Sequence, residues 1–258
     1  MSADRGSSAE RSARGGDLCL WRDKRIVEQI VYRNELKYQC SEQQMRMLEM
    51  RIKNLCRPDP HAGEGGKYTV RSVYFDDYRD SCYYENEDGV DSREKFRIRI
   101  YDGKTGLITL ESKEKINGLG HKSACRISGE LCREILGGEF KMPESADSVL
   151  NKFFLHYRTR MYRPKVVVEY ERTPFIYSAG NVRITFDRNI TATAHVDTFL
   201  EPRIYARPVM PAGMHLLEVK FDGLLPDHIY HTLQLRDLQR TAYSKYYTSR
   251  RFTAGFCV

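Results

Sequence analysis

Residues 94–122 have the sequence EKFRIRIYDGKTGLITLESKEKINGLGHK, in which charged and apolar residues alternate in two segments. Successive side chains of a β-strand point to opposite faces. In the first segment Arg97 and Arg99 therefore share one face, and the opposite face is formed by Phe96, Ile98 and Ile100. In the second segment one face carries Glu111, Lys113 and Lys115. Both segments are predicted to be amphipathic strands, whose charged faces meet either solvent or a ligand.

Three more predicted strands show the same alternation. Their charged or polar faces are formed by Arg33, Glu35 and Lys37, by Arg183, Thr185 and Asp187, and by Glu218 and Lys220. In a single strand this pattern is typical of an ordinary sheet with one solvated face. Five such strands also allow a closed barrel whose charges face inward and whose apolar faces are covered by helices. Because unpaired buried ions are costly, that barrel requires interleaved carboxylates and an anionic ligand. Periodicity alone leaves both geometries open.

The remaining elements follow from periodicity and from turn and cap residues. Strands are predicted over 27–38, 67–75, 94–101, 106–115, 121–128, 164–175, 181–190 and 215–223. Helices are predicted over 41–55, capped by Ser41, within 129–163, and over 225–239. The segment 76–89 is expected to be a polar loop, and 240–252 a tail rich in tyrosine and basic residues. Eight strands without a βαβ rhythm predict an α+β, mainly antiparallel fold, a sheet or barrel with peripheral helices.

Composition limits the class of protein. The chain has 258 residues, of which 41% are hydrophobic and 30% charged, as in soluble globular proteins. Its net charge of +7 and pI near 9.0 suggest an anionic partner, which could be nucleic acid, a lipid surface or a phosphorylated small molecule. No apolar run is long enough to span a bilayer.

Residues 1–25 are rich in Ser, Gly, Ala and Arg and lack the apolar region of a signal peptide. They are predicted to be a disordered leader that precedes one folded domain over 26–258. The seven cysteines are scattered and form no CxxC pair. Reduced thiols and a cytoplasmic location are therefore expected.

Eight motifs follow one another along the chain. They are RNELKY (33–38), RSVYFDD (71–77), KFRIRIY (95–101), LESKEK (110–115), VVVEYERTPF (166–175), VRITFD (182–187), LLEVKFDG (216–223) and YSKY (243–246). In this order the chain resembles, from about 26 to 252, the VTC domain, the polyphosphate polymerase branch of the triphosphate tunnel metalloenzyme superfamily. The resemblance implies an eight-stranded antiparallel tunnel barrel, lined by basic residues, with peripheral helices.

The resemblance also implies the site residues. The positions that match the family's phosphate-binding and catalytic residues are Lys37, Arg97, Arg99, Lys113, Lys122, Arg172, Arg183 and Lys245. The family's metal-binding glutamate falls on Glu218, and Glu35 is a second candidate metal ligand. The implied cofactor is a divalent ion, Mn²⁺ or Mg²⁺. Both ions prefer oxygen ligands such as those of carboxylates and phosphates. Arginine grips phosphate with a planar fork, whereas lysine acts as a point charge.

Two positions depart from related patterns. Ala242 stands where the eukaryotic VTC pattern carries a second lysine, with Arg240 nearby, which leaves one phosphate contact unassigned. Arg33 replaces the first glutamate of the ExExK motif of adenylate cyclases and thiamine triphosphatases, which favours the VTC branch. The membrane and inositol-phosphate-sensing parts of the eukaryotic proteins have no counterpart here, so the chain looks like a stand-alone bacterial version.

The implied activity is transfer of the γ-phosphate of ATP to a polyphosphate chain, with release of ADP. A metal-dependent tripolyphosphatase or nucleoside triphosphatase using the same residues is an alternative, as is a non-catalytic module that binds polyphosphate or nucleotide. Nucleic acid is not an expected partner, because the cations alternate beside carboxylates and no RNP, KH or helix-turn-helix signature occurs. Association with a membrane partner protein is left open.

Overall fold

Eight long strands form one antiparallel sheet in the computed structural model, which describes residues 32–63, 65–143, 147–235 and 237–255. They are β1 (Asn34–Ser41), β3 (Tyr68–Asp76), β4 (Arg93–Tyr101), β5 (Lys104–Ile116), β6 (Leu119–Ile127), β7 (Arg163–Tyr177), β8 (Val182–Thr193) and β10 (Met214–Phe221). Two short strands, β2 (Arg57–Pro58) and β9 (Arg207–Pro208), pair with β7 and β8. The predicted antiparallel, mainly β fold is confirmed. The leader and residues 27–31 of the first predicted strand lie outside the described residues.

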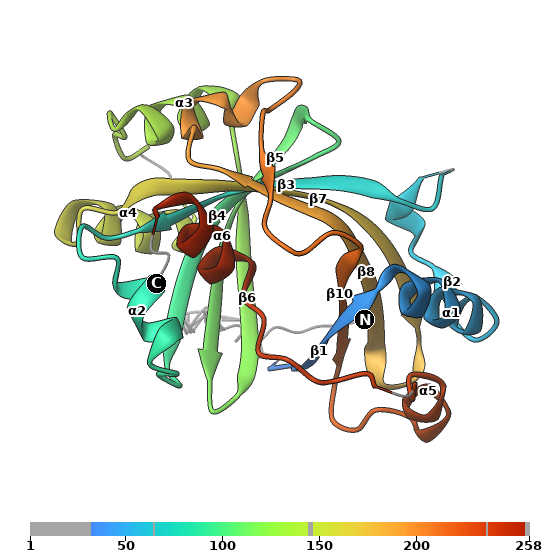
Figure 1. Cartoon of the computed structure of the whole chain (residues 1–258). Helices are drawn as coiled ribbons and strands as arrows, with labels where there is room; N and C mark the ends of the chain where they lie inside the picture. Colours follow the sequence, from blue (N-terminus) through green and yellow to red (C-terminus); the bar gives the residue numbers. More distant parts are fainter. Residues whose placement is uncertain (1–31, 64, 144–146, 236, 256–258) are drawn as a thin grey trace, which may run out of the picture. The chain divides into compact units, whose positions relative to one another are not determined.

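The sheet curls until its two edge strands meet at one point (Figure 1). The strand order is β1-β10-β8-β7-β3-β4-β5-β6, so β1 and β6 are the edges. Just before β1, Arg33 exchanges two backbone hydrogen bonds with Gly120 of β6, at 3.0 and 3.1 Å. The free edge of β1 also accepts a hydrogen bond of 2.8 Å at the Lys37 carbonyl from the Thr241 amide. The sheet is therefore a curled barrel that one isolated bridge and a late segment of the chain complete.

Within the described residues, six helices and three 3₁₀ turns surround the sheet. The helices are α1 (Glu42–Lys53), α2 (Ser81–Glu87), α3 (Gly129–Gly137), α4 (Ser148–Thr159), α5 (Asp227–Thr232) and α6 (Lys245–Thr253), and the turns are η1 (Pro60–Ala62), η2 (Ala179–Asn181) and η3 (Val196–Leu200). Ser41 caps α1 as predicted, because its hydroxyl accepts from the Gln44 amide while the Gln44 side chain accepts from the Ser41 amide.

Three expectations for the helices are wrong. The segment 76–89 is not wholly a loop, because α2 forms where the buried Asp76 carboxylate accepts hydrogen bonds from the amides of Cys82 and Tyr83, at 2.9 and 3.1 Å. The tail contains α6, which begins at the capping residue Ser244. The helix expected over 225–239 ends at Thr232.

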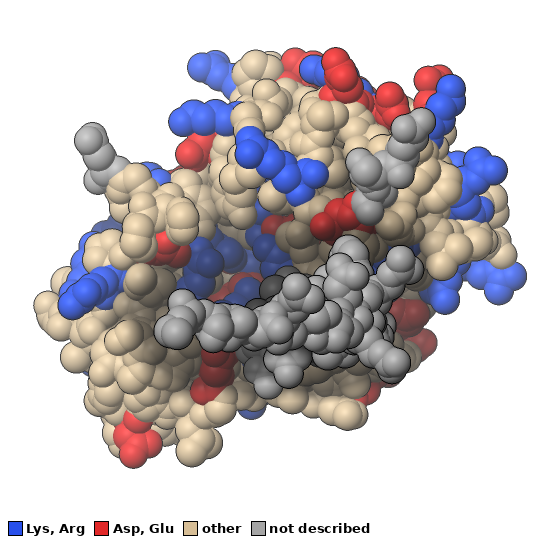
Figure 2. All heavy atoms as spheres, turned by 180° about the vertical axis from the view of Figure 1, so that it is seen from behind, with Lys and Arg blue, Asp and Glu red and all other residues tan. Residues whose placement is uncertain are grey.

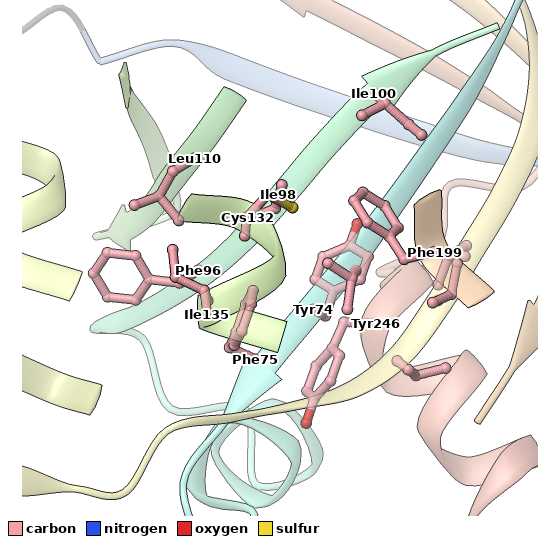
Figure 3. Close-up of a cluster of buried hydrophobic side chains, with 14 of the residues drawn as sticks. Tyr74, Phe75, Phe96, Ile98, Ile100, Leu110, Cys132, Ile135, Phe199 and Tyr246 are labelled. Carbon is pink, nitrogen blue, oxygen red and sulfur yellow. The ribbon is translucent and has the colours of Figure 1, made fainter. Parts of the chain in front are cut away.

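The apolar faces of the strands point outward and pack beneath the helices. Val182, Ile184 and Leu217 form one cluster with residues of α1 and α5, including Met45 and Ile229. A second cluster joins the apolar face of β4 to α3 and α4; Figure 3 shows Ile98 of β4 facing Cys132 and Ile135 of α3. Of the two geometries that periodicity leaves open, the structure adopts the barrel with apolar faces outside.

The described cysteines belong to these outer layers. Cys40, Cys56, Cys82, Cys125 and Cys132 are free and buried, and Cys19 and Cys257 lie outside the described residues. Burial raises the pKa of Cys40 to about 12, so this thiol stays protonated at neutral pH. Among the described helices, none has the length and apolar character needed to cross a membrane.

Replacing Phe153 by alanine is expected to lower the free energy of unfolding by about 3–5 kcal/mol, because a fully buried aromatic side chain is lost and a cavity remains. Phe153 of α4 has no exposed surface and contacts the rings of Phe75 and Phe96. Leu155→Ala on the same helix, where the side chain is 59% exposed, should change it by less than about 0.5 kcal/mol. Urea unfolding followed by circular dichroism makes the comparison. Equal losses in both variants would contradict the assignment of the core.

Candidate active site

A cavity of about 480 Å³ lies on the charged side of the sheet. Inward-facing residues of β1, β4, β5, β7 and β10 line it, together with residues 240–246. Figure 2 shows lysine and arginine side chains gathered in a hollow on the face opposite to that of Figure 1. Eight of the ten predicted site residues line the cavity, namely Glu35, Lys37, Arg97, Arg99, Lys113, Arg172, Glu218 and Lys245.

Glu111 of β5 is the centre of the first ion-pair group. Its side chain is 1% exposed, and its carboxylate lies 2.8 Å from Arg97 Nη2 and 2.7 Å from Lys122 Nζ. Arg99 Nη1 lies 3.6 Å from the same carboxylate. Burial by itself would raise the pKa of Glu111, but Arg99, Arg97 and Lys122 hold that pKa well below its usual range. Lys122 thus joins the site through Glu111, although it does not line the cavity itself.

The second group is centred on Asp187 of β8 and Glu218 of β10. Arg172 binds Asp187 through two hydrogen bonds of 2.7 Å, from Nε and Nη2. Lys245 Nζ lies 2.7 Å from Asp187 Oδ2 and 2.7 Å from Glu218 Oε1. Burial alone would lower the pKa of Lys245, but the two carboxylates raise it above its usual value. The N-terminal residue of α6 is therefore a cation inside the barrel.

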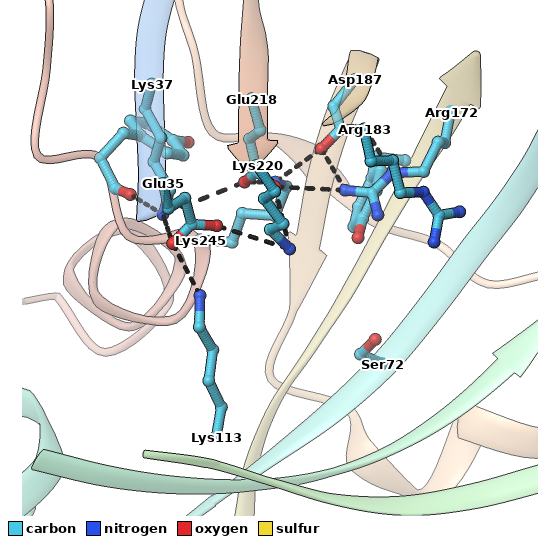
Figure 4. A network of polar contacts seen from close by, with 12 residues as sticks. Glu35, Lys37, Ser72, Lys113, Arg172, Arg183, Asp187, Glu218, Lys220 and Lys245 are labelled. Carbon is cyan, nitrogen blue, oxygen red and sulfur yellow. Dashed lines mark hydrogen bonds and ion pairs between the residues drawn. The ribbon is translucent and has the colours of Figure 1, made fainter. Parts of the chain in front are cut away.

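The third group lies between β1 and β10, where Glu35 and Glu218 share two lysines (Figure 4). Lys37 Nζ is 3.7 Å from Glu35 and 4.0 Å from Glu218. Lys220 Nζ is 3.5 Å from Glu35 and 4.0 Å from Glu218. Lys113 reaches across the cavity from β5 to Glu35, at 2.9 Å. Burial lowers the pKa of Lys220 to about 7 despite both carboxylates.

Glu35 and Glu218 are two neighbouring carboxylates that could together hold a divalent metal ion. The described residues contain no group of three or more His, Cys, Asp and Glu side chains suited to a metal. The buried Glu35 Oε1 accepts no hydrogen bond from the described residues. Two carboxylates fit Mg²⁺ or Mn²⁺ when water and phosphate oxygens supply the remaining ligands. The donor set thus fits an ion whose remaining ligands are oxygen atoms of water or of a bound anion.

Arg183, like Lys122, does not line the cavity, and unlike Lys122 it forms its ion pair outside the three groups described above. It is on the inward side of β8, but its guanidinium binds Asp59 Oδ2 at 2.8 Å and the Tyr68 hydroxyl at 3.2 Å. Its side chain is 36% exposed. In this structure Arg183 connects β8 to η1 and β3, and it does not line the cavity that the other arginines share.

Several lining residues were not among the predicted site residues. Lys220 follows Glu218 by two positions and Lys95 precedes Arg97 by two, so strict two-residue periodicity would have found both. Two tyrosines also line the cavity and orient the arginines. The Tyr74 hydroxyl accepts from Arg97 Nη1 at 3.1 Å, and the Tyr170 hydroxyl accepts from Arg99 Nη2 at 3.5 Å. From the sequence alone, an aromatic residue on a strand is more readily assigned to core packing. The polar role of these two tyrosines was therefore not predicted.

Comparison with known families and structures agrees with this architecture. A family model described as the VTC domain matches residues 32–253. No curated protein matches the chain.

Solved structures of similar fold have low sequence identity to this chain. A candidate adenylyl cyclase from Hippeastrum with a dominant triphosphatase activity is 13% identical, with a TM-score of 0.51 over 86% of this chain and 97% of that one. A candidate adenylate cyclase from Bacillus halodurans is 16% identical, with a TM-score of 0.46 over 78% of this chain and 87% of that one. The Mimivirus capping enzyme triphosphatase is 7% identical, with a TM-score of 0.34 over 79% and 90%. The predicted triphosphate tunnel fold is confirmed.

Glu111→Gln is expected to destabilise the ligand-free protein by about 3–5 kcal/mol, because three cations lose their shared buried carboxylate. Glu114→Gln is the matched control, since Glu114 contacts Lys152 on the outer side of the same strand and is 26% exposed. The control should lose less than about 1 kcal/mol. Both values come from urea unfolding at pH 7 and 0.15 M salt. An equal loss at the two positions would show that Glu111 is not the centre of a buried group.

The same carboxylates predict a decrease in stability in acid. Glu111, Asp187 and Glu218 have pKa values below their unfolded values, because neighbouring cations outweigh the effect of burial. They therefore stabilise the fold above their unfolded pKa of about 4, and this contribution is lost as the pH falls toward the lower folded values. Unfolding free energies measured between pH 5 and 2 should fall steeply in the wild type and less steeply in Glu111→Gln. Parallel curves would contradict this linkage.

Proposed function

Because this chain belongs to the VTC domain family, we propose that it is a polyphosphate polymerase that transfers the γ-phosphate of ATP to a polyphosphate chain. The observation that carries the proposal is the charge inside the barrel. The three ion-pair groups contain eight cations, Lys37, Arg97, Arg99, Lys113, Lys122, Arg172, Lys220 and Lys245, and only four carboxylates, Glu35, Glu111, Asp187 and Glu218. Such an excess of positive charge in a concave site attracts a polyanion.

Phosphoryl transfer requires chiefly that the reacting groups are aligned and that the charge on the phosphate oxygens is neutralised. Arg97 and Arg99 provide adjacent planar guanidinium groups that can each grip a phosphate through two hydrogen bonds. Tyr74, Tyr170 and Glu111 hold these groups in place before substrate arrives. The proposal assigns the transferred phosphate to Arg97 and Arg99 and the remaining phosphates to Lys37, Lys113 and Arg172.

Glu218 and Glu35 would hold a Mn²⁺ or Mg²⁺ ion. When bound, the ion would neutralise charge on the phosphate oxygens and on the leaving diphosphate. Lys37 and Lys220 now contact both carboxylates at 3.5–4.0 Å, distances longer than a strong ionic hydrogen bond. These loose contacts support a role in which the two ammonium groups would turn toward the phosphate oxygens of a bound substrate.

The second candidate function is hydrolysis of tripolyphosphate or a nucleoside triphosphate. The similarity in fold to the Hippeastrum protein, which has a dominant triphosphatase activity, favours this alternative. The same cations would then neutralise the same phosphates while water acts as the acceptor. A non-catalytic module that binds polyphosphate or nucleotide is the remaining alternative. For each of them we propose a cytoplasmic protein, which the free buried thiols support.

Incubation of the purified protein with ATP and Mn²⁺ or Mg²⁺ tests these functions. If the protein is a polymerase, long-chain polyphosphate and ADP should accumulate together. Gel staining detects the polyphosphate, and nucleotide chromatography detects the ADP. Free phosphate without polymer would identify a hydrolase. Binding of ATP or polyphosphate without turnover would identify the module.

Arg97→Gln is expected to lower kcat at least about a hundredfold, because a preorganised cation is removed from the transferred phosphate. Arg133→Gln is the control, since it removes the same charge from an exposed position on α3. The steady-state rate of ADP release from ATP is the measurement. Equal activity in the two variants would reject the assignment of Arg97 to the reacting phosphate.

Glu218→Gln is expected to weaken Mn²⁺ binding at least about tenfold in the presence of tripolyphosphate, since one of two protein carboxylates is lost. Titration followed by the electron paramagnetic resonance signal of free Mn²⁺ gives the affinity without any turnover. Glu130→Gln, on the exposed side of α3, controls for the loss of negative charge. Unchanged Mn²⁺ affinity in Glu218→Gln would place the metal elsewhere.

A further inference from the structure

The two aspartates at the end of the motif RSVYFDD have no role in the proposed function. The first of them, Asp76, has no exposed surface. Its carboxylate accepts the amide hydrogen bonds of Cys82 and Tyr83 that begin α2, and it also accepts a hydrogen bond from the hydroxyl of Tyr246 in α6. Asp76 and Tyr246 are 170 residues apart in the sequence. One buried carboxylate therefore joins α2 to a helix near the end of the chain.

Tyr246 connects this carboxylate to the candidate active site. It lines the cavity, although only 2% of its surface is exposed. The centre of its ring lies 5.5 Å from the centre of the Tyr74 ring and 5.2 Å from Lys95 Nζ. Figure 3 shows the two tyrosines beside each other. The Tyr74 hydroxyl in turn accepts from Arg97. Asp76 thus fixes a ring that forms part of the cavity wall.

The residue before Tyr246 is Lys245, the first residue of α6. A helix N-terminus carries partial positive charge, so a cation at this place is unfavourable, and the first turn of α6 has no acidic residue to offset it. Asp187 and Glu218 attract Lys245, but they act on the end of a long, flexible side chain. The contact between Asp76 and Tyr246 instead fixes the helix itself, one residue further on.

Other contacts between α2 and α6 support the same arrangement. The rings of Tyr83 and Tyr247 stack with their centres 4.9 Å apart. Arg250 Nη2 donates to Asp80 Oδ1 at 3.0 Å, just before α2 begins. The ion pair is partly exposed, whereas the hydrogen bond from Tyr246 is buried and ends on a carboxylate. A hydrogen bond to a charged group is stronger than one between neutral groups, and water does not compete for it inside the protein.

We propose that Asp76 is a positioning residue of the active site, which acts through the Tyr246 hydroxyl to hold the start of α6 so that Lys245 reaches into the barrel. This inference rests on the proposed function, which gives Lys245 its place among the reacting groups. Asp76 itself is fully buried and touches no substrate. Without the hydroxyl contact, α6 would shift, and Lys245 would separate from the two carboxylates that it now compensates.

Tyr246→Phe tests the proposal without any measurement of activity. Lysine acylation, quantified on peptides by mass spectrometry, reports how accessible and how strongly protonated Lys245 is. The rate at Lys245, relative to the exposed Lys104, should rise at least about fivefold, because a hydrogen bond to a charged group is lost. Tyr162→Phe is the matched control, since that tyrosine is also 2% exposed and its hydroxyl lies 3.4 Å from Cys82 Sγ in α2. It should change the rate by less than about twofold.

A double-mutant cycle gives a second readout, which a merely structural role would not produce. In the presence of Lys245, Tyr246→Phe should lower the kcat of ADP release from ATP at least about fivefold. In the background Lys245→Gln, the same change should lower it less than about twofold, because the group that Tyr246 positions is already missing. Asp76→Asn should act as Tyr246→Phe does. Should Asp76→Asn fail to fold, Tyr246→Phe decides, since it leaves the amide bonds that begin α2 intact.

Each contrary result has a distinct meaning. Unchanged acylation of Lys245 in Tyr246→Phe would overturn the positioning role, whatever the activity. A rise accompanied by faster labelling of the buried Cys132 thiol would indicate general unfolding and overturn it as well. Equal losses of kcat in both backgrounds would show that Tyr246 does not act through Lys245. A wild type that neither turns over ATP nor binds phosphate compounds would instead refute the proposed function, while the acylation result would still decide how Lys245 is held.

Discussion

A charge enclosed in a protein is stable only when another charge or a ligand compensates it, and the interior of this barrel depends on that constraint. Glu111 compensates two arginines and a lysine, and Asp187 compensates Arg172 and Lys245. These pairs join strands that are distant in the sequence, so they fix the barrel as well as the site. Where carboxylates are too few, positive charge remains available for a ligand.

The same constraint accounts for the outer layers. Once the polar faces of the strands turn inward, their apolar faces must be covered from outside. The helices α1, α3, α4 and α5 perform this task, with buried residues such as Leu48, Ile135, Phe153 and Ile229. The core therefore lies between sheet and helices, and the centre of the barrel is left for solvent and ligand. The site is large because no hydrophobic core competes for that space.

Much of this architecture could be predicted from the sequence, and the rest depends on tertiary contacts. Two-residue periodicity identified the inward-facing residues of β4, β5 and β10, because strand geometry alone determines which residues share a face. It could not show that Arg183 would bind Asp59, since that partner comes from a loop far away in the sequence. The short helix α2 was missed because the buried Asp76 satisfies its first amides. The position of Lys245 required the family resemblance, because a helix N-terminus gives no periodic signal.

The late segment that completes the barrel has a consequence for biosynthesis. The Lys37 ammonium donates to the Tyr243 carbonyl across 206 residues of chain, and Lys245 supplies the counter-charge for two carboxylates on earlier strands. Contacts of such sequence separation form slowly, because long loops must close before they contribute stability. A nascent chain on the ribosome cannot assemble the site until Tyr243 and Lys245 have emerged. A product truncated before Lys245 would hold Asp187 and Glu218 without that cation, so it would lack the second ion-pair group.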